Sequence, residues 1–149
     1  RAVIQRVGRA EITIDHRETR SIGQGLVVFL GVMKGATDKQ ADFLAEKVQG
    51  LRVFTDENGK MNLSLEDTGG ELLVVSNFTL GTDCKRAVGP PLTCGPPEEA
   101  ERLYRHFVER AKALGIRKVE TGEFGAYMEV HAKRRAGEPF ASITGKDRQ

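Results

Sequence analysis

The stretch GLVVFLGV at residues 25–32 decides the fold that the sequence predicts. It is a continuous apolar run, rich in β-branched residues and bounded by glycines, which is typical of a central strand of a sheet. The run LLVV at 72–75 is equally apolar and predicts a strand that is buried on both faces. The core is therefore expected to form around these two strands.

Two segments that precede the first run alternate apolar and polar residues, which is the period-two pattern of a strand. They are RAVIQRV at 1–7 and AEITI at 10–14. Gly8 lies between them and suits a tight connection or a β-bulge. The N-terminal part of the chain is therefore expected to hold three strands.

A helix is predicted at 37–50, because apolar residues recur there at helical spacing. Thr37 and Gln40 match a capping box at its start, and Gly50 is a residue type that often ends a helix. The segment 97–115 predicts a second amphipathic helix, which begins with a proline and ends at a glycine.

The other predicted elements are short. They are a strand at 51–54, a turn at 56–59, a strand or extended loop at 61–65 and two strands within 117–132. The total is about seven or eight strands with two main helices, too few helices for alternating βαβ units. The sequence predicts an α+β fold: a single domain over residues 1–149 with a β-barrel-like, largely closed sheet.

Composition and cysteine content restrict the classes of function. The 149 residues carry a formal net charge of +2, which permits a nucleic acid as partner without requiring one. No apolar run approaches the roughly 20 residues of a membrane span. Cys84 and Cys94 are too few for a disulfide framework and have no histidine at zinc-finger spacing. We expect reduced thiols in a cytoplasmic protein with no membrane contact and no metal.

The LLVV strand ends in an unusual group of polar residues, Ser76, Asn77 and Thr79. Buried strands rarely carry such residues, because each unsatisfied polar group costs a few kcal/mol. One interpretation is a strand end whose side chains satisfy neighbouring backbone groups. The other is a cleft beneath the segment 81–99, which shows no periodicity and is long for a loop. Residue spacing does not choose between them.

Several motifs in order resemble the D-aminoacyl-tRNA deacylases, also called D-tyrosyl-tRNA deacylases. They are RAVIQRV, GLVVFLGV, GKMNLSL, LLVVSNFTL and TGEFGAYMEV, which together cover about residues 1–131. SNFTL is similar to the signature Ser-Gln-Xaa-Thr of this family, with Asn77 where glutamine is usual. The resemblance implies a β-barrel-like α+β fold and a homodimer with its active site at the subunit interface. It also implies that no metal or organic cofactor takes part.

The implied activity is hydrolysis of the ester that joins a D-amino acid, or glycine, to the 3′-terminal adenosine of tRNA. This reaction is a proofreading step in translation. By resemblance, Ser76, Asn77 and Thr79 surround the reacting ester, and the backbone amide of Phe78 donates a hydrogen bond to the developing oxyanion. The alternative is a related protein that binds aminoacyl-tRNA or another acyl-nucleotide without hydrolysis, or with a different acyl substrate.

The resemblance also implies substrate-binding residues. Gly137 and Pro139 match a Gly-Pro turn that presents carbonyl oxygens to the substrate ammonium bound in the other subunit, although Glu138 separates them here. Leu92 and Gly95, in the long loop, are expected to hold the terminal adenine.

Overall fold

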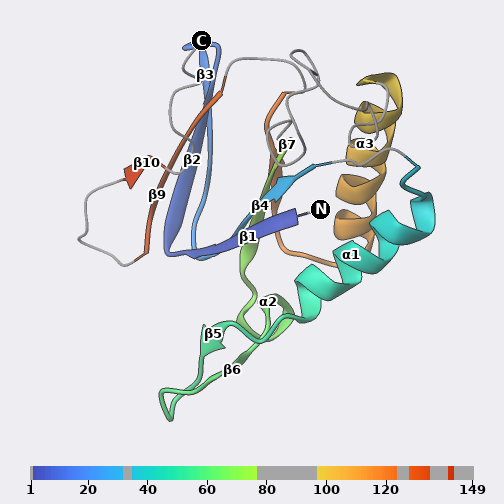
Figure 1. The fold of residues 1–149 in the computed structure, drawn as a ribbon. Helices are drawn as coiled ribbons and strands as arrows, with labels where there is room; N and C mark the ends of the chain where they lie inside the picture. The colour runs from blue at the N-terminus through green and yellow to red at the C-terminus, as the bar shows by residue number, and fades with distance from the viewer. Residues whose placement is uncertain (1, 32–34, 77–96, 124–127, 135–140, 143–149) are drawn as a thin grey trace, which may run out of the picture.

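The computed structural model describes residues 2–31, 35–76, 97–123, 128–134 and 141–142 (Figure 1). The described strands are β1 (Ala2–Val7), β2 (Arg9–Ile14), β3 (Glu18–Ile22), β4 (Gly25–Leu30), β5 (Phe54–Thr55), β6 (Met61–Leu63), β7 (Glu71–Ser76), β8 (Val119–Thr121), β9 (Met128–Lys133) and β10 (Ala141–Ser142). The described helices are α1 (Asp38–Gly50), α2 (Leu65–Thr68) and α3 (Pro97–Ala113). None of these helices is long and apolar enough to cross a membrane.

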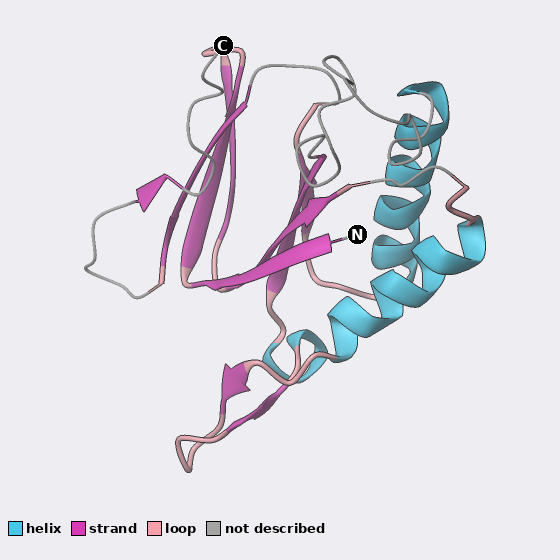
Figure 2. Ribbon diagram, viewed as in Figure 1, coloured by secondary structure: helices cyan, strands magenta, loops and turns pink. Residues whose placement is uncertain are grey.

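The elements form three layers (Figure 2). The central layer is a four-stranded sheet in the order β1-β4-β7-β8, in which β4, β7 and β8 are parallel. Helices α1 and α3 cover one face of this sheet, since parallel strands need long crossover connections. The second four-stranded sheet, β10-β9-β2-β3, is antiparallel and covers the other face.

Strand β4 is buried on both faces, as its sequence predicts. Leu26, Val28 and Leu30 belong to the core that packs against the helices. Val27 and Phe29 alternate with them and belong to the core between the two sheets. Because successive side chains of a strand point to opposite faces, one uninterrupted apolar run supplies both cores.

The predicted α+β fold class is confirmed. The two sheets stack face to face instead of closing into one barrel, so the barrel-like description applies only in a loose sense. The chain passes from one sheet to the other at Gly8: β1 pairs with β4 in the first sheet, and its continuation β2 pairs with β9 in the second. The backbone N–H of Gly8 donates to the carbonyl of Lys133 (2.8 Å), which secures this change of sheet.

Both predicted helices are present. Thr37 caps α1 and exchanges both capping-box hydrogen bonds with Gln40, as predicted. Gly50 is the last residue of α1, and Leu51 in extended conformation forms its C-cap. The helix therefore ends at the predicted residue without the left-handed glycine cap. Helix α3 is followed by Gly115, whose positive φ of 86° is the expected stop.

The described residues hold ten strands and three helices, more than the sequence predicts. The sequence does not predict strand β3. Its residues ETRSI show no apolar alternation, and only Ile22 among them is buried. Helix α2 begins where a strand or extended loop was the expectation. Its signal is a capping box, in which Ser64 and Asp67 bond to each other's backbone N–H.

Candidate functional site

Ser76 is the last residue of β7 and lies opposite Leu30 at the end of β4. Ser76 is half-buried, in contrast to the fully buried run that precedes it. Strand alternation places its side chain on the helix-facing side of the sheet, with those of Leu72 and Val74. The polar strand end therefore lies at the carboxyl edge of parallel strands, where the sheet meets the helical layer.

The end of β7 is held from two sides. The hydroxyl of Tyr104 in α3 donates to the carbonyl of Val74 (2.8 Å), and the backbone N–H of Gly122 donates to the same oxygen (3.1 Å). Tyr104 is only 5% exposed. Because both lone pairs of this buried carbonyl are used, the backbone two residues before Ser76 has little freedom. The site is built on a rigid strand.

Burial also changes the acidity of Tyr104. It raises the pKa of this phenol to about 12, although hydrogen bonds with Thr121 and the Gly122 backbone act in the opposite direction. Arg20 donates from Nη1 to the carbonyl of Thr121 (2.7 Å) and is itself held by the carboxylate of Glu18. The hydrogen bond from Arg20 lowers the pKa of Glu18. Because its pKa is about 12, Tyr104 remains a neutral hydrogen-bond donor at physiological pH.

We expect the Tyr104→Phe variant to lose less stability than wild type as the pH rises from 10 to 12. The pKa of Tyr104 is about 12 in the folded chain against 10 for an ordinary tyrosine, so this group stabilises the fold fully below pH 10 and loses that contribution between pH 10 and 12. Two pKa units correspond to about 2–3 kcal/mol of unfolding free energy. Urea unfolding across this pH range tests the expectation; equal pH slopes for wild type and variant would refute it.

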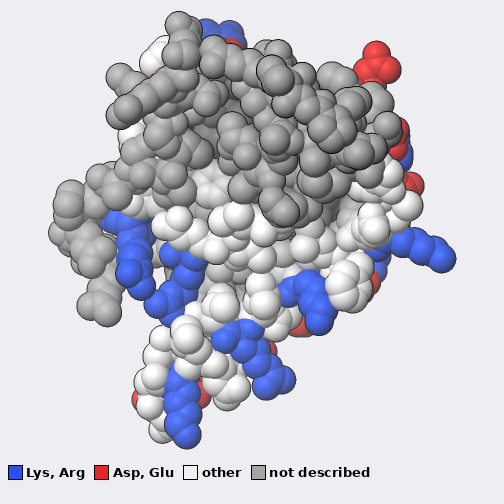
Figure 3. Space-filling view, viewed as in Figure 1, with Lys and Arg blue, Asp and Glu red and all other residues white. Residues whose placement is uncertain are grey.

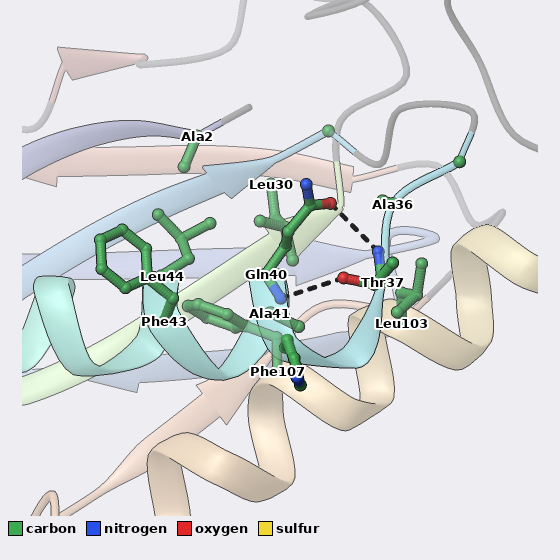
Figure 4. A pocket seen from close by; sticks show the side chains of 13 residues that line it. Ala2, Leu30, Ala36, Thr37, Gln40, Ala41, Phe43, Leu44, Leu103 and Phe107 are labelled. Atoms are coloured by element: carbon green, nitrogen blue, oxygen red, sulfur yellow. Dashed lines mark hydrogen bonds between the residues drawn. The ribbon is translucent and has the colours of Figure 1, made fainter.

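Two hollows lie near the ends of the strands that neighbour β7 in the sheet. A cavity of about 700 Å³ lies on the β4 side, lined by Leu30 and Gly31 and by residues of α1 such as Phe43 and Leu44 (Figure 4). A second hollow of about 500 Å³ lies on the β8 side, where Thr121 contributes to its lining. The sheet order puts β7 between them. The hollows therefore lie beside the two neighbours of β7, and no described residue of β7 itself lines either of them.

Of the predicted site residues, Ser76 alone lies in the described part of the chain. The others, Asn77, Phe78, Thr79, Leu92, Gly95, Gly137 and Pro139, lie outside the described residues, as do Cys84 and Cys94. Among the described residues, no group of three or more His, Cys, Asp or Glu side chains is placed to hold a metal ion.

Sequence reasoning missed the support that Tyr104, Thr121 and Arg20 give to the strand end. Tyr104 lies on the apolar face of the predicted amphipathic helix, whose pattern indicates burial and no hydrogen-bond partner. The available signal was its hydroxyl group, because a buried tyrosine needs a hydrogen-bond partner. Arg20 belongs to the strand that the sequence did not predict, so its contact with Thr121, 101 positions away, had no local signal.

A half-buried polar group at the carboxyl edge of parallel strands in an α+β fold lies where ligands bind in many proteins with open parallel sheets. Comparison with known proteins narrows this class. Residues 3–137 match the model of the family described as D-Tyr-tRNA(Tyr) deacylase. The chain belongs to this family, which confirms the resemblance found in its sequence motifs.

Individual relatives agree. A D-aminoacyl-tRNA deacylase of Thermotoga petrophila is 49% identical over 132 residues, which are 88% of each chain. One from Geotalea uraniireducens is 46% identical over 150 residues and covers 100% of this chain and 96% of its own length. The family match therefore extends over nearly the whole sequence.

Solved structures have the same fold. The c-Myc DNA Unwinding Element Binding Protein superposes with a TM-score of 0.76 at 35% identity, covering 97% of both chains. A probable eukaryotic D-amino acid tRNA deacylase superposes with a TM-score of 0.73 over 90% of this chain and 93% of its own. At 14% identity, this second likeness shows the fold alone.

Proposed function

We propose that this chain is a D-aminoacyl-tRNA deacylase, a hydrolase that cleaves the ester between a D-amino acid and the 3′-terminal adenosine of tRNA. The observation that carries this function is the family match over residues 3–137, together with relatives of that name at 46–53% identity. Its substrate is aminoacyl-tRNA, and its role is proofreading in translation. The relatives give no support to the alternative of a non-hydrolysing binding protein.

The strand end supports a site of this kind. Ester hydrolysis assisted by hydrogen-bond donors needs those donors at fixed positions, since preorganised dipoles lower the barrier most. Ser76 follows a segment anchored by Tyr104 and Gly122. We assign Ser76, Asn77 and Thr79 to contacts with the reacting ester and the backbone amide of Phe78 to the oxyanion.

The substrate-binding assignments rest on the family resemblance. Gly137 and Pro139 are assigned to the substrate ammonium, and Leu92 and Gly95 to the terminal adenine. The assignment of the ammonium contact requires a second subunit, so a homodimer is part of the proposal. The chain is taken as one domain over residues 1–149 that acts in the cytoplasm without a cofactor.

The function is tested by deacylation of matched D- and L-aminoacyl-tRNAs, with glycyl-tRNA as the achiral substrate. We expect hydrolysis of the D-aminoacyl ester and of the glycyl ester, while the L-aminoacyl ester persists. Equal rates on the D- and L-esters, or no release of any amino acid, would count against the proposed activity.

Dimerisation has its own measurement. Sedimentation equilibrium at micromolar concentration is expected to give twice the 16.4 kDa mass of the chain. In a two-fold dimer the same surface of each subunit faces its partner, so each C-terminal turn would serve the other subunit's site. A mass of one chain at these concentrations would exclude the shared site.

A further inference from the structure

Helix α1 divides its surface into stripes of different chemistry. One stripe is acidic, and each of its residues contacts an arginine or histidine side chain of α3. Asp38 contacts Arg102 (2.8 Å), Asp42 contacts His106 (2.8 Å) and Glu46 contacts Arg110 (2.8 Å). The acids recur every four residues, so they lie on one side of the helix. The negative charge of α1 is thus directed toward α3.

A second stripe of α1 points away from α3 and is cationic. Lys39, Phe43 and Lys47 also recur every four residues, and all three are exposed. Phe43 is 61% exposed, and the ammonium of Lys47 lies 5.4 Å from the centroid of its ring. Lys39 and Lys47 are about 12 Å apart along the helix axis at 1.5 Å per residue. We call Lys39, Phe43 and Lys47 the α1 stripe.

The cations of the α1 stripe and those of α3 differ in whether they form ion pairs. On α3, Arg102, Arg105, Arg110 and Lys112 each lie within 4.0 Å of a carboxylate. Within the described ranges, no ion pair involves the cations that follow one another from α1 into the β5–β6 hairpin: Lys39, Lys47, Arg52 and Lys60. Figure 3 shows Lys and Arg side chains spread over this face with little acidic surface between them.

The hairpin keeps part of its own acidic charge away from the surface cations. The carboxylate of Asp56 accepts hydrogen bonds from the backbone N–H groups of Asn58 and Lys60 (2.9 and 3.0 Å). Lys60 itself is exposed and takes part in no ion pair among the described residues. A chain with a net charge of only +2 therefore presents, within its described part, a run of exposed cations without ion pairs along α1 and the hairpin.

The α1 stripe begins beside the candidate site. Lys39 and Phe43 line the same cavity as Leu30, the residue that lies opposite Ser76 in the sheet. From there α1 runs along the molecule to its C-terminal end near α2 and the β5–β6 hairpin (Figure 1). A linear polyanion with one end at Ser76 would meet Lys39 first, then Lys47, and then Arg52 and Lys60.

We propose that the α1 stripe, extended by Arg52 and Lys60, binds the phosphate backbone of the substrate tRNA next to its aminoacyl end. This inference rests on the proposed function and adds the surface that holds the RNA. Lysine and arginine that neutralise phosphates release condensed counterions, so binding is favoured by entropy and weakened by salt. Contacts to the backbone carry no base specificity, which suits an enzyme that accepts tRNAs charged with different amino acids.

The test removes the stripe charges and compares two substrates. The variant Lys39→Glu/Lys47→Glu is measured against Arg17→Glu/Arg117→Glu, which makes the same change of charge at exposed positions outside both hollows. Each protein is assayed on D-aminoacyl-tRNA and on the D-aminoacyl ester of adenosine, which has no phosphate backbone. The readouts are KM and kcat for both substrates and the salt dependence of KM for the tRNA.

For the stripe variant, we expect KM for the tRNA to rise at least tenfold at low salt, with kcat retained. The preference for tRNA over the adenosine ester should fall by the same factor. The slope of log KM against log salt should decrease by about 1.4–1.8, since the variant removes two phosphate contacts that contribute about 0.7–0.9 each. The control variant should change the KM for the tRNA and the salt slope by less than half as much.

The outcomes separate this inference from the proposed function. If wild-type protein hydrolyses both D-esters but the stripe variant keeps its preference for tRNA and its salt slope, the surface proposal is wrong and the activity stands. If wild-type protein hydrolyses neither ester, the proposed function itself fails. Equal losses in the stripe and control variants would indicate a response to net charge, which also overturns the α1 surface.

Discussion

Gly25→Ala is expected to destabilise the native fold by about 3 kcal/mol or more. Gly25 opens β4 and lies opposite Glu71 at the start of β7. A Cβ at position 25 would lie 1.7 Å from the carbonyl oxygen and 2.6 Å from the carbonyl carbon of Glu71. These are backbone atoms of a neighbouring central strand, so no side-chain rotation can relieve the overlap. The two strands would have to separate.

The size of the destabilisation follows from the strand pairing that such a separation would break. Strands β4 and β7 pair in parallel over six residues each, and both cores of the protein depend on them. Overpacking a core costs roughly 1–3 kcal/mol when side chains can adjust, and more when backbone must move. We expect a loss of at least about 3 kcal/mol out of the 5–15 kcal/mol typical of a domain.

Urea unfolding monitored by circular dichroism provides the measurement, and Gly50→Ala provides the matched control. Gly50 is the last residue of α1, and a Cβ there would meet no atom within 4 Å. Alanine is favoured over glycine in a helix by up to about 1 kcal/mol, so this variant should be as stable as wild type or more so. Equal unfolding midpoints for Gly25→Ala and wild type would disprove the steric argument.

Thr79→Ala is expected to lower the single-turnover rate on D-aminoacyl-tRNA at least tenfold, while tRNA affinity stays nearly constant. The proposal assigns the Thr79 hydroxyl to the reacting ester. A contact that is made mainly in the transition state changes the rate without changing ground-state binding. A tenfold loss corresponds to about 1.4 kcal/mol of activation free energy. Alanine removes the hydroxyl without adding bulk, so a change in rate would not result from overpacking of the site.

Thr55→Ala is the matched control, because Thr55 is an exposed residue of β5, away from the end of β7. It should leave the single-turnover rate unchanged. If Thr79→Ala folds normally and is as fast as wild type, the SNFTL segment is a satisfied strand end and the catalytic assignment must move elsewhere. If tRNA affinity falls along with the rate, Thr79 contributes to ground-state binding instead.

Patterns that repeat within a few residues are enough to predict much of this fold. The apolar run in β4, the helical spacing in α1 and α3 and the glycine after α3 each express a local preference of the backbone. The family, and with it the activity, could also be recognised from sequence, because the motifs keep their order along the chain. Elements without a strong local pattern, such as β3 with its polar residues ETRSI, were missed.

The contacts that build the site and the charged face depend on the tertiary structure alone. Tyr104 reaches Val74 across 30 positions, and Asp42 reaches His106 across 64. Such pairs form only when two elements dock at one register, and neither element carries a local signal of its partner. The same docking turns the acids of α1 toward α3 and leaves Lys39 and Lys47 exposed. Composition shows only a net charge of +2, because it sums charges that the fold separates in space.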